Sequence, residues 1–237
     1  MRHLPNLITL ANLFCGCLAI IAIFNAKLEL AGVLVIIAAV LDFLDGFAAR
    51  LLKAYSDIGK QLDSLADMVT FGVVPGLMLY TIFYMGNASS DLSENQLLAG
   101  QYSMLLVTLF SALRLAKFNI DTRQTDYFIG VPTPANTLVV ISFAFILSHD
   151  EFGWSPVIYH PLFLIGFAIL SSFLMVAEIP LISFKFKSFG FTENKGRYLL
   201  LLISVLALLI FRYAAAPVIV LFYVLLSLIF PPQKKNT

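Results

Sequence analysis

Long apolar runs separated by short polar stretches dominate the pattern of hydrophobic and polar positions along this chain. A helix of about 20 apolar residues spans the roughly 30 Å hydrocarbon core of a bilayer, because each residue adds about 1.5 Å. Runs of this kind predict eight membrane-spanning helices, near residues 6–26, 28–51, 60–85, 96–118, 132–149, 158–184, 197–212 and 214–231. The pattern therefore predicts an all-α, polytopic membrane bundle folded as one transmembrane domain over residues 1–237.

Glycine, proline and small polar residues mark the breaks between these runs, as at residues 86–91 and 130–134. The last two runs are divided mainly by Arg212 and Pro217, so a count of seven helices stays open.

The composition supports a membrane location and argues against a nucleic-acid partner. Hydrophobic residues make up 60% of the chain, against roughly 45–50% in soluble domains. The formal net charge is only +1, so there is no basic excess of the kind that nucleic acid attracts. We therefore expect membrane lipids to surround the chain. Whether it forms a homodimer is left open.

The basic residues are sorted unevenly between the two sides of the predicted bundle. With the N-terminus in the cytoplasm, 13 of the 15 basic residues face that side, and only Lys27 and Arg212 face the other. The thirteen are Arg2, Arg50, Lys53, Lys60, Arg114, Lys117, Arg123, Lys185, Lys187, Lys195, Arg197, Lys234 and Lys235. Cytoplasmic loops carry such an excess of Lys and Arg. This asymmetry predicts a multi-pass protein of the cell (cytoplasmic) membrane, with both termini and the opening of the active site in the cytoplasm.

Four aspartates interrupt the second and third apolar runs. Asp42 and Asp45 are three residues apart and Asp63 and Asp67 are four apart, so each pair lies on one face of its helix. A charged side chain at the bilayer centre costs about 2.5–3.5 kcal/mol on insertion scales. Too few basic residues lie at this depth to pair all four, and oxygen ligands favour hard divalent cations. We predict that the four aspartates bind Mg²⁺ or Mn²⁺, as a two-ion site; polar contacts between helices are the alternative.

Small residues and a cation follow the first pair of aspartates. Gly46 and Ala49 have small side chains, which allow a ligand or a neighbouring helix to approach closely. The guanidinium of Arg50, the next residue, can bind phosphate through two hydrogen bonds. Ser56 and Gly59 offer a hydroxyl and exposed backbone in the next turn. These residues predict a seat for a nucleotide or diphosphate, with ordinary helix packing and capping as the alternative.

The spacing of these residues, D-x-x-D-G-x-x-A-R-x8-G-x3-D-x3-D over residues 42–67, resembles the motif of the CDP-alcohol phosphatidyltransferase family. No position departs from the pattern. The resemblance implies that the first three aspartates hold the metal pair and that Asp67 also acts as catalytic base. It further implies that Gly46, Ala49, Arg50 and Ser56 bind the CDP-lipid. The PNLIT stretch at residues 5–9 also resembles family members and adds Asn6 to that set; an ordinary helix start, with proline near the first turn, is the alternative. In the family reaction, an alcohol hydroxyl attacks the lipid-side phosphorus of a CDP-lipid and CMP leaves.

Three further stretches, residues 64–75, 114–119 and 128–135, resemble the branch of this family that uses L-serine as acceptor and makes phosphatidylserine from CDP-diacylglycerol. That branch usually has arginine where Lys117 stands. Serine carries a carboxylate, so its site needs a cation, and we expect Arg114, Lys117 and Asn119 to bind the acceptor. The alternative role for these residues is anchoring the helix to anionic lipid headgroups.

Other functions stay open at this point. Glycerol 3-phosphate or inositol phosphate as acceptor calls for a larger basic cluster than Arg114 and Lys117. A cation transporter calls for acids spread over several helices, whereas here they crowd onto two neighbouring ones. Glu178 falls in the sixth predicted helix, where it either lines a cavity or lies at the membrane surface.

Overall fold

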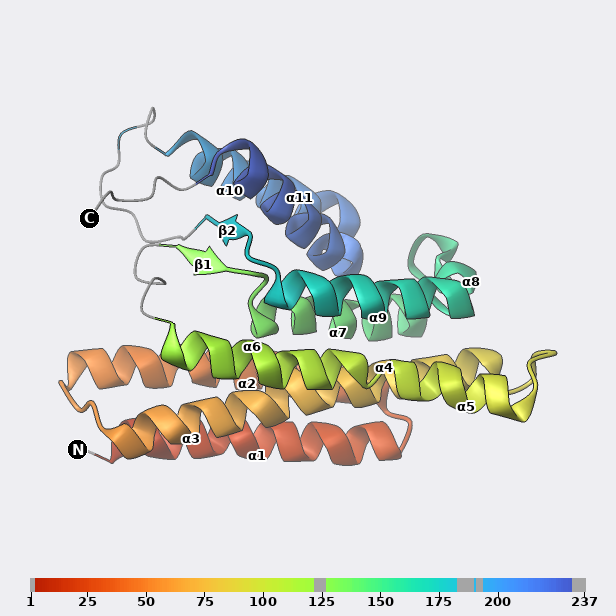
Figure 1. The fold of residues 1–237 in the computed structure, drawn as a ribbon, viewed down its shortest axis with the longest axis horizontal. Coiled ribbons are helices and arrows are strands. Elements are labelled where there is room, and N and C mark those ends of the chain that lie inside the picture. The colour runs from red at the N-terminus through yellow and green to blue at the C-terminus, as the bar shows by residue number, and fades with distance from the viewer. Residues whose placement is uncertain (1–2, 122–126, 183–189, 191–193, 232–237) are drawn as a thin grey trace.

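The computed structural model describes residues 3–121, 127–182, 190 and 194–231. Its described part is a helical bundle with one short pair of strands (Figure 1). Six of the basic residues assigned above to the cytoplasmic side lie outside the described residues: Arg2, Arg123, Lys185, Lys187, Lys234 and Lys235.

The N-terminal half forms one layer of long helices. The elements are α1 (Leu4–Phe24), α2 (Leu28–Leu51), α3 (Asp57–Met68), the π-helical η1 (Val69–Val73), α4 (Val74–Asn87), α5 (Glu94–Ser103) and α6 (Leu106–Ile120). Helix α1 packs against both α2 and α3, and α3 continues through η1 into α4. The Ser56 side chain caps α3 by accepting a hydrogen bond from the Gly59 backbone N–H at 3.0 Å. The motif at residues 42–67 therefore lies on α2, α3 and the turn between them, and α1 packs against both helices.

The C-terminal half covers this layer from one side (Figure 1). Its helices are α7 (Thr133–His149), η2 (Glu151–Gly153), α8 (Ser155–Ile158), α9 (Pro161–Val176), α10 (Lys195–Phe211), η3 (Arg212–Ala214) and α11 (Ala215–Ile229). The strands β1 (Phe128–Ile129) and β2 (Pro180–Leu181) pair antiparallel, with Phe128 opposite Leu181. Helices α10 and α11 pack side by side as a hairpin, so α11 ends at the end of the bundle where α1 begins.

The structure confirms the all-α class and refines the predicted spans. Five helical stretches are long and apolar enough to cross a membrane: Leu4–Phe24, Leu28–Leu51, Asp57–Asn87, Glu94–Ile120 and Lys195–Ile229. Helices α7 and α9, with 17 and 16 residues, are shorter. The last stretch reverses direction at Arg212, which has φ 43°. Each predicted run overlaps a helix or a continuous series of helices, but the number of crossings stays a prediction.

One predicted helix, over residues 158–184, is wrong at both ends. Helix α9 begins at Pro161, because α8 and a short link precede it, and it ends at Val176. Ala177 is extended (φ −62°, ψ 141°), and β2 follows at Pro180. Glu178 therefore lies in an extended link after α9 and not inside a helix.

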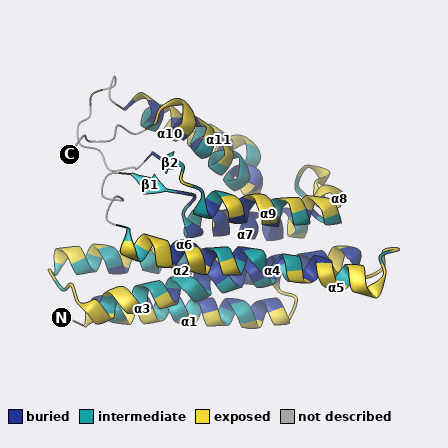
Figure 2. Cartoon of the chain, viewed as in Figure 1, coloured by how far each residue is buried: buried dark blue, intermediate teal, exposed yellow. Residues whose placement is uncertain are grey.

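The distribution of apolar side chains fits a membrane environment. Large residues such as Phe71, Met78 and Phe83 are buried between the helices. Others point outward, including Phe14 at 62% exposure and Phe24 at 78%. Figure 2 shows buried positions where helices face one another and exposed positions along their outer faces. Soluble proteins rarely leave so much contiguous apolar surface in water, so we conclude that this is a multi-pass membrane protein.

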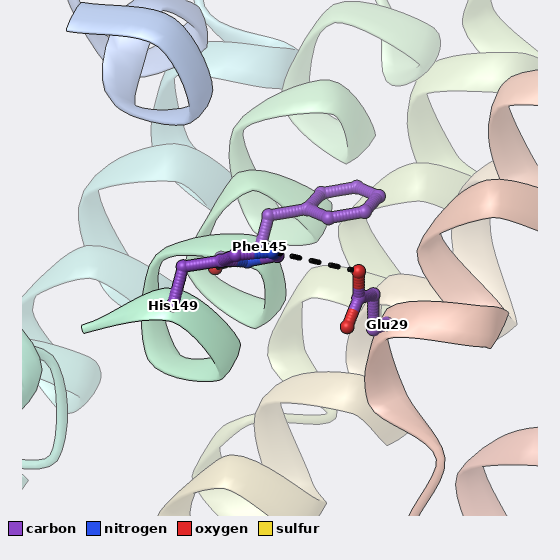
Figure 3. Close-up of polar contacts among 3 residues, drawn as sticks. All are labelled: Glu29, Phe145 and His149. Atoms are coloured by element: carbon purple, nitrogen blue, oxygen red, sulfur yellow. Dashed lines mark hydrogen bonds and ion pairs between the residues drawn. The ribbon is translucent and has the colours of Figure 1, made fainter. Parts of the chain in front are cut away.

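A polar contact ties the layers together at the end of the bundle away from the start of α1. His149 of α7 places its Nε2 3.9 Å from Glu29 Oε1 of α2, and its Nδ1 lies 3.0 Å from the Phe145 carbonyl oxygen (Figure 3). The imidazole also stacks on Tyr213, with ring centroids 4.7 Å apart. These contacts join α2, α7 and the α10–α11 turn far from the predicted motif.

The π-helical segment η1 follows directly after the motif helix α3. Threonine side chains satisfy its backbone carbonyls: Thr137 Oγ1 donates to Phe71 at 3.1 Å, and Thr108 Oγ1 donates to Gly72 at 2.9 Å. Helix α1 approaches so closely that a Cβ on Gly16 would lie 2.5 Å from Thr70 Oγ1. These contacts hold the end of α3, and with it Asp67, against α1, α6 and α7.

Candidate active site at one end of the bundle

Three of the predicted aspartates meet between α2 and α3. Asp42, Asp63 and Asp67 each offer a carboxylate oxygen, and these oxygens lie within 4.8 Å of one another. All three residues are half-buried, and Asp42 interacts electrostatically with Asp63. The meeting follows from the sequence, because Asp63 and Asp67 are one helical turn apart and therefore share a face of α3.

The fourth aspartate is held by helix α1. Asp45 is only 5% exposed, and its Oδ2 accepts a hydrogen bond from Thr9 Oγ1 at 2.6 Å. Its carboxylate lies outside the 4.8 Å group but close enough to interact electrostatically with Asp42 and Asp63. The structure thus gathers four acids at one place, three in a tight group and one beside it.

The donor set fits a hard divalent cation. The Oδ1 atom of Asp67 is buried and has no hydrogen-bond partner. Native structures rarely leave a buried polar atom unpaired without a reason such as an ion. Carboxylate oxygens are the ligands that Mg²⁺ and Mn²⁺ prefer. The three clustered aspartates, with Asp45 next to them, are therefore suited to binding such an ion.

A cavity of about 480 Å³ opens beside the aspartates, between the start of α1, the end of α2 and the start of α3. Asp45 and Asp63 line it. So do all five residues predicted to bind the CDP-lipid: Asn6, Gly46, Ala49, Arg50 and Ser56. The structure therefore brings together residues from three helices that the sequence predicted to share one ligand.

Two glycines shape this cavity in different ways. A Cβ on Gly46 would meet nothing within 4 Å, so the absence of a side chain there leaves open space in the cavity. A Cβ on Gly59 would lie 3.0 Å from both Asn6 Oδ1 and Ser56 Oγ, which is tighter than most real contacts. Gly59 therefore lets the start of α3 approach Asn6 on α1.

The cavity is also lined by polar residues that the sequence did not single out as site residues: Thr9, Tyr55 and Lys60. Lys60 gives the cavity a second cation besides Arg50, and its Nζ also donates a hydrogen bond to the Asn119 backbone carbonyl at 3.4 Å. Helical spacing carried a signal for two of them. Thr9 is three residues after Asn6, and Lys60 is three residues before Asp63, so each shares a face with a predicted site residue.

A second cavity, of about 300 Å³, is lined by residues of α6, β1 and the end of α9. Arg114 and Lys117, both predicted to bind the acceptor, line it. Arg114 is only 6% exposed, lies over the Phe118 ring at 5.0 Å, and interacts electrostatically with Asp67. Arg114 thus connects this cavity with the aspartate cluster.

Asn119, the third residue predicted to bind the acceptor, does not line the second cavity. Its Nδ2 donates a hydrogen bond to Ser64 Oγ at 2.8 Å, and its backbone carbonyl accepts the bond from Lys60. These bonds tie the end of α6 to α3. The position of Asn119 therefore favours a role in holding the two helices together.

Comparisons with known proteins identify sequences that are similar to this chain. Residues 2–182 match the family model described as CDP-alcohol phosphatidyltransferase. The chain is 35% identical over 192 residues to the CDP-diacylglycerol–serine O-phosphatidyltransferase of Bacillus subtilis, covering 78% of this chain and 93% of that protein. A protein of the same name from Helicobacter pylori (strain J99) is 37% identical over 183 residues, 76% of this chain and 72% of its own. Another from Mycobacterium bovis is 31% identical over 235 residues, 96% of this chain and 76% of its own.

Proposed function

The chain belongs to the CDP-alcohol phosphatidyltransferase family, and we propose that it transfers the phosphatidyl group of CDP-diacylglycerol to the hydroxyl of L-serine, giving phosphatidylserine and CMP. The observation that carries this proposal is the cluster of Asp42, Asp63 and Asp67, which lies beside two cavities of different chemistry. Relatives that share about a third of their residues with this chain carry the name of that activity.

The first cavity binds the CDP part of the lipid substrate. Its two cations, Arg50 and Lys60, neutralise phosphate oxygens, and the guanidinium can form two parallel hydrogen bonds to one phosphate. The open space at Gly46 admits the nucleotide next to Asp45. Ser56 and Asn6 supply polar groups at the rim of the same cavity.

Asp42, Asp45, Asp63 and Asp67 bind divalent metal, Mg²⁺ or Mn²⁺, in a two-ion site. When bound, the metal supplies positive charge to the diphosphate and to the oxygen that leaves with CMP. The residues themselves are already arranged for this task, because Thr9 holds Asp45 at 2.6 Å and Asp67 keeps one buried oxygen unpaired. Preorganised ligands spare the cost of gathering like charges during the reaction.

Asp67 acts as the base for the incoming alcohol. In the transfer, the serine hydroxyl oxygen forms a bond to the lipid-side phosphorus and gives its proton to Asp67. The bond from that phosphorus to the bridging oxygen of the diphosphate breaks, and CMP leaves with the electron pair. Asp67 is suited to this role because it belongs to the aspartate cluster and also interacts electrostatically with Arg114 of the acceptor cavity.

Arg114 and Lys117 bind the carboxylate of serine in the second cavity. Arg114 donates no hydrogen bond to any residue in the described part of the chain, although it is only 6% exposed. A buried guanidinium needs an acceptor, and a substrate carboxylate provides one. The names of the relatives favour serine over glycerol 3-phosphate or inositol phosphate, and family membership argues against the cation-transporter alternative.

The active site faces the cytoplasm, with both chain ends on the same side. The first cavity lies at the end of the bundle where α1 begins and α2 ends, together with Arg50, Lys60 and Lys195. Glu29, Asp91 and Glu94 lie at the opposite end. This sorting is what an excess of cytoplasmic Lys and Arg predicts for the cell membrane.

Release of CMP tests the proposed function. Purified protein in vesicles that contain CDP-diacylglycerol receives L-serine, glycerol 3-phosphate or inositol phosphate in separate reactions with Mg²⁺ or Mn²⁺. We expect CMP and phosphatidylserine to form with serine and little CMP with the phosphorylated alcohols. CMP release with a phosphorylated alcohol and none with serine would refute serine as the acceptor.

A further inference from the structure

The second cavity contains charges of both signs. Arg114 and Lys117 come from α6, whereas Glu178 comes from the link between α9 and β2. Among the described residues, Glu178 forms no ion pair within 4.0 Å with either cation, and it makes no hydrogen bond through its side chain. Opposite charges that line one cavity without pairing leave room for a ligand that carries both signs.

The backbone on each side of Glu178 is fixed. The Val131 N–H donates to the Leu174 carbonyl at 2.9 Å, and the Gly130 N–H donates to the Ile179 carbonyl at 3.0 Å. Gly130 has φ 73°, and a Cβ there would lie 2.3 Å from the Met175 carbonyl oxygen. The strand pair and Gly130 therefore hold the link in place, so Glu178 is presented to the cavity by a rigid segment.

The chemistry of serine matches this arrangement of charges. Its carboxylate and ammonium share one carbon, and its hydroxyl lies on the next. Binding of the carboxylate at Arg114 brings serine to the residue of this cavity that interacts electrostatically with Asp67, the proposed base. The ammonium then needs an anion among the remaining residues that line the cavity, and Glu178 is one whose side chain makes no contact with another charge in the described chain.

We propose that Glu178 binds the ammonium group of the acceptor and thereby selects serine over acceptors that lack a positive charge; this rests on the proposed function. A dianionic phosphate ester gains nothing from Glu178 and is repelled by it. The sequence alone allowed Glu178 either to line a cavity or to lie at the membrane surface, and its position in the lining with Arg114 and Lys117 favours the cavity.

The test compares L-serine with 3-hydroxypropanoate, which has the carboxylate and hydroxyl but no ammonium. The affinity of the analogue is measured as an acceptor or as a competitive inhibitor against serine. In Glu178→Gln and Glu178→Ala, we expect the KM for serine to rise about 5- to 20-fold. This increase is small for the loss of a charge-assisted contact, because Glu178 is exposed and water weakens the interaction. The affinity for 3-hydroxypropanoate and the KM for CDP-diacylglycerol should change little.

The readout that decides the matter is the preference for serine over the analogue. A purely structural role for Glu178 would weaken both acceptors equally and leave that preference unchanged, which would overturn the inference. The inference also fails if Asp121→Asn lowers the preference and the Glu178 variants do not, because Asp121 also lines the cavity. Glu94→Gln, at the far end of the bundle, is the matched control and should match wild type.

The two proposals fail in different ways. Wild-type protein that releases no CMP with serine refutes the proposed function. Wild-type protein that makes phosphatidylserine, with Glu178 variants that keep the full preference for serine, refutes only the role of Glu178.

Discussion

The two cavities beside the aspartates differ in how the chain builds them. The first draws on residues 5–63, from three helices that follow one another in sequence. The second joins α6 to β1 and to the link after α9, so its residues span positions 114–178. A site built from consecutive helices leaves fixed spacings in the sequence, whereas a site built from distant segments becomes visible only once the chain has folded.

The cationic side chains of the two cavities also differ in their exposure to solvent. Arg50 and Lys60 of the first cavity are exposed, whereas Arg114 of the second is 6% exposed. A charge interaction is weakened by water and strengthened by burial. We therefore expect single substitutions to cost more at the buried Arg114 than at the exposed Arg50.

Removing divalent metal should have the largest effect, because the account places the reaction of both substrates at the aspartates. Metal stabilises transition-state charge by several kcal/mol, so treatment with excess EDTA should lower the rate by at least about 1,000-fold. Adding back Mg²⁺ or Mn²⁺ should restore it. Full CMP release in excess EDTA would show that the cluster works without metal.

Substituting single aspartates comes next. Asp42→Asn and Asp63→Asn each remove one ligand charge, and we expect a loss of roughly 100- to 1,000-fold in kcat with altered metal titration curves. Asp57→Asn is the matched control, since Asp57 lies on the same helix as Asp63 but outside the cluster and the cavity. Wild-type metal titration in the cluster variants would place the metal elsewhere.

A pair of glycine substitutions tests the shape of the first cavity. Gly46→Ala places a methyl group in the open space of the cavity, where it would clash with the bound nucleotide. Overpacking costs about 1–3 kcal/mol, so the KM for CDP-diacylglycerol should rise roughly 5- to 150-fold. Gly166→Ala on α9 also meets nothing within 4 Å but lies outside both cavities, so it should retain normal kinetics. Equal kinetics in the two variants would mean that the nucleotide does not occupy the space at Gly46.

The smallest expected effect concerns the support of Asp45 by α1. Thr9→Val removes the hydroxyl that donates to Asp45 at 2.6 Å while nearly keeping the shape of the side chain. A typical net hydrogen-bond contribution of about 0.5–1.5 kcal/mol predicts that the half-saturating metal concentration rises roughly 2- to 10-fold. An unchanged metal titration would show that Thr9 does not position a metal ligand.

The sequence was most informative where helical spacing alone decides the geometry. The one-turn separation of Asp63 and Asp67 predicted their common face, and the five residues predicted for the CDP-lipid line one cavity. Apolar runs predicted the helices for the same reason. The spacing did not show that Thr9 would reach Asp45, because that contact depends on how α1 packs against α2.

The second cavity was less predictable from the sequence, because its lining depends on where α6 and α9 end and how the chain continues from them. The apolar pattern extended a helix through residue 184, but Ala177 is extended and α9 ends at Val176. That early end is what brings Glu178 to the second cavity. Asn119 was predicted to bind the acceptor because it shares a helix end with Arg114 and Lys117 in a stretch that resembles the serine branch, and its side chain donates a hydrogen bond to Ser64. Neighbours in sequence at the end of a helix point in different directions.

The central claim is that the two substrates bind in separate cavities that meet at the aspartates, and steady-state kinetics of Arg50→Ala and Arg114→Ala test it most directly. With each substrate varied in turn, Arg114→Ala should raise the KM for serine by roughly 10- to 150-fold, the worth of one charge-assisted contact, and leave that for CDP-diacylglycerol near wild type. Arg114→Lys should recover only part of the loss, because an ammonium lacks the planar fork. Arg50→Ala should raise mainly the KM for CDP-diacylglycerol. Equal changes in both constants for either variant would contradict the account.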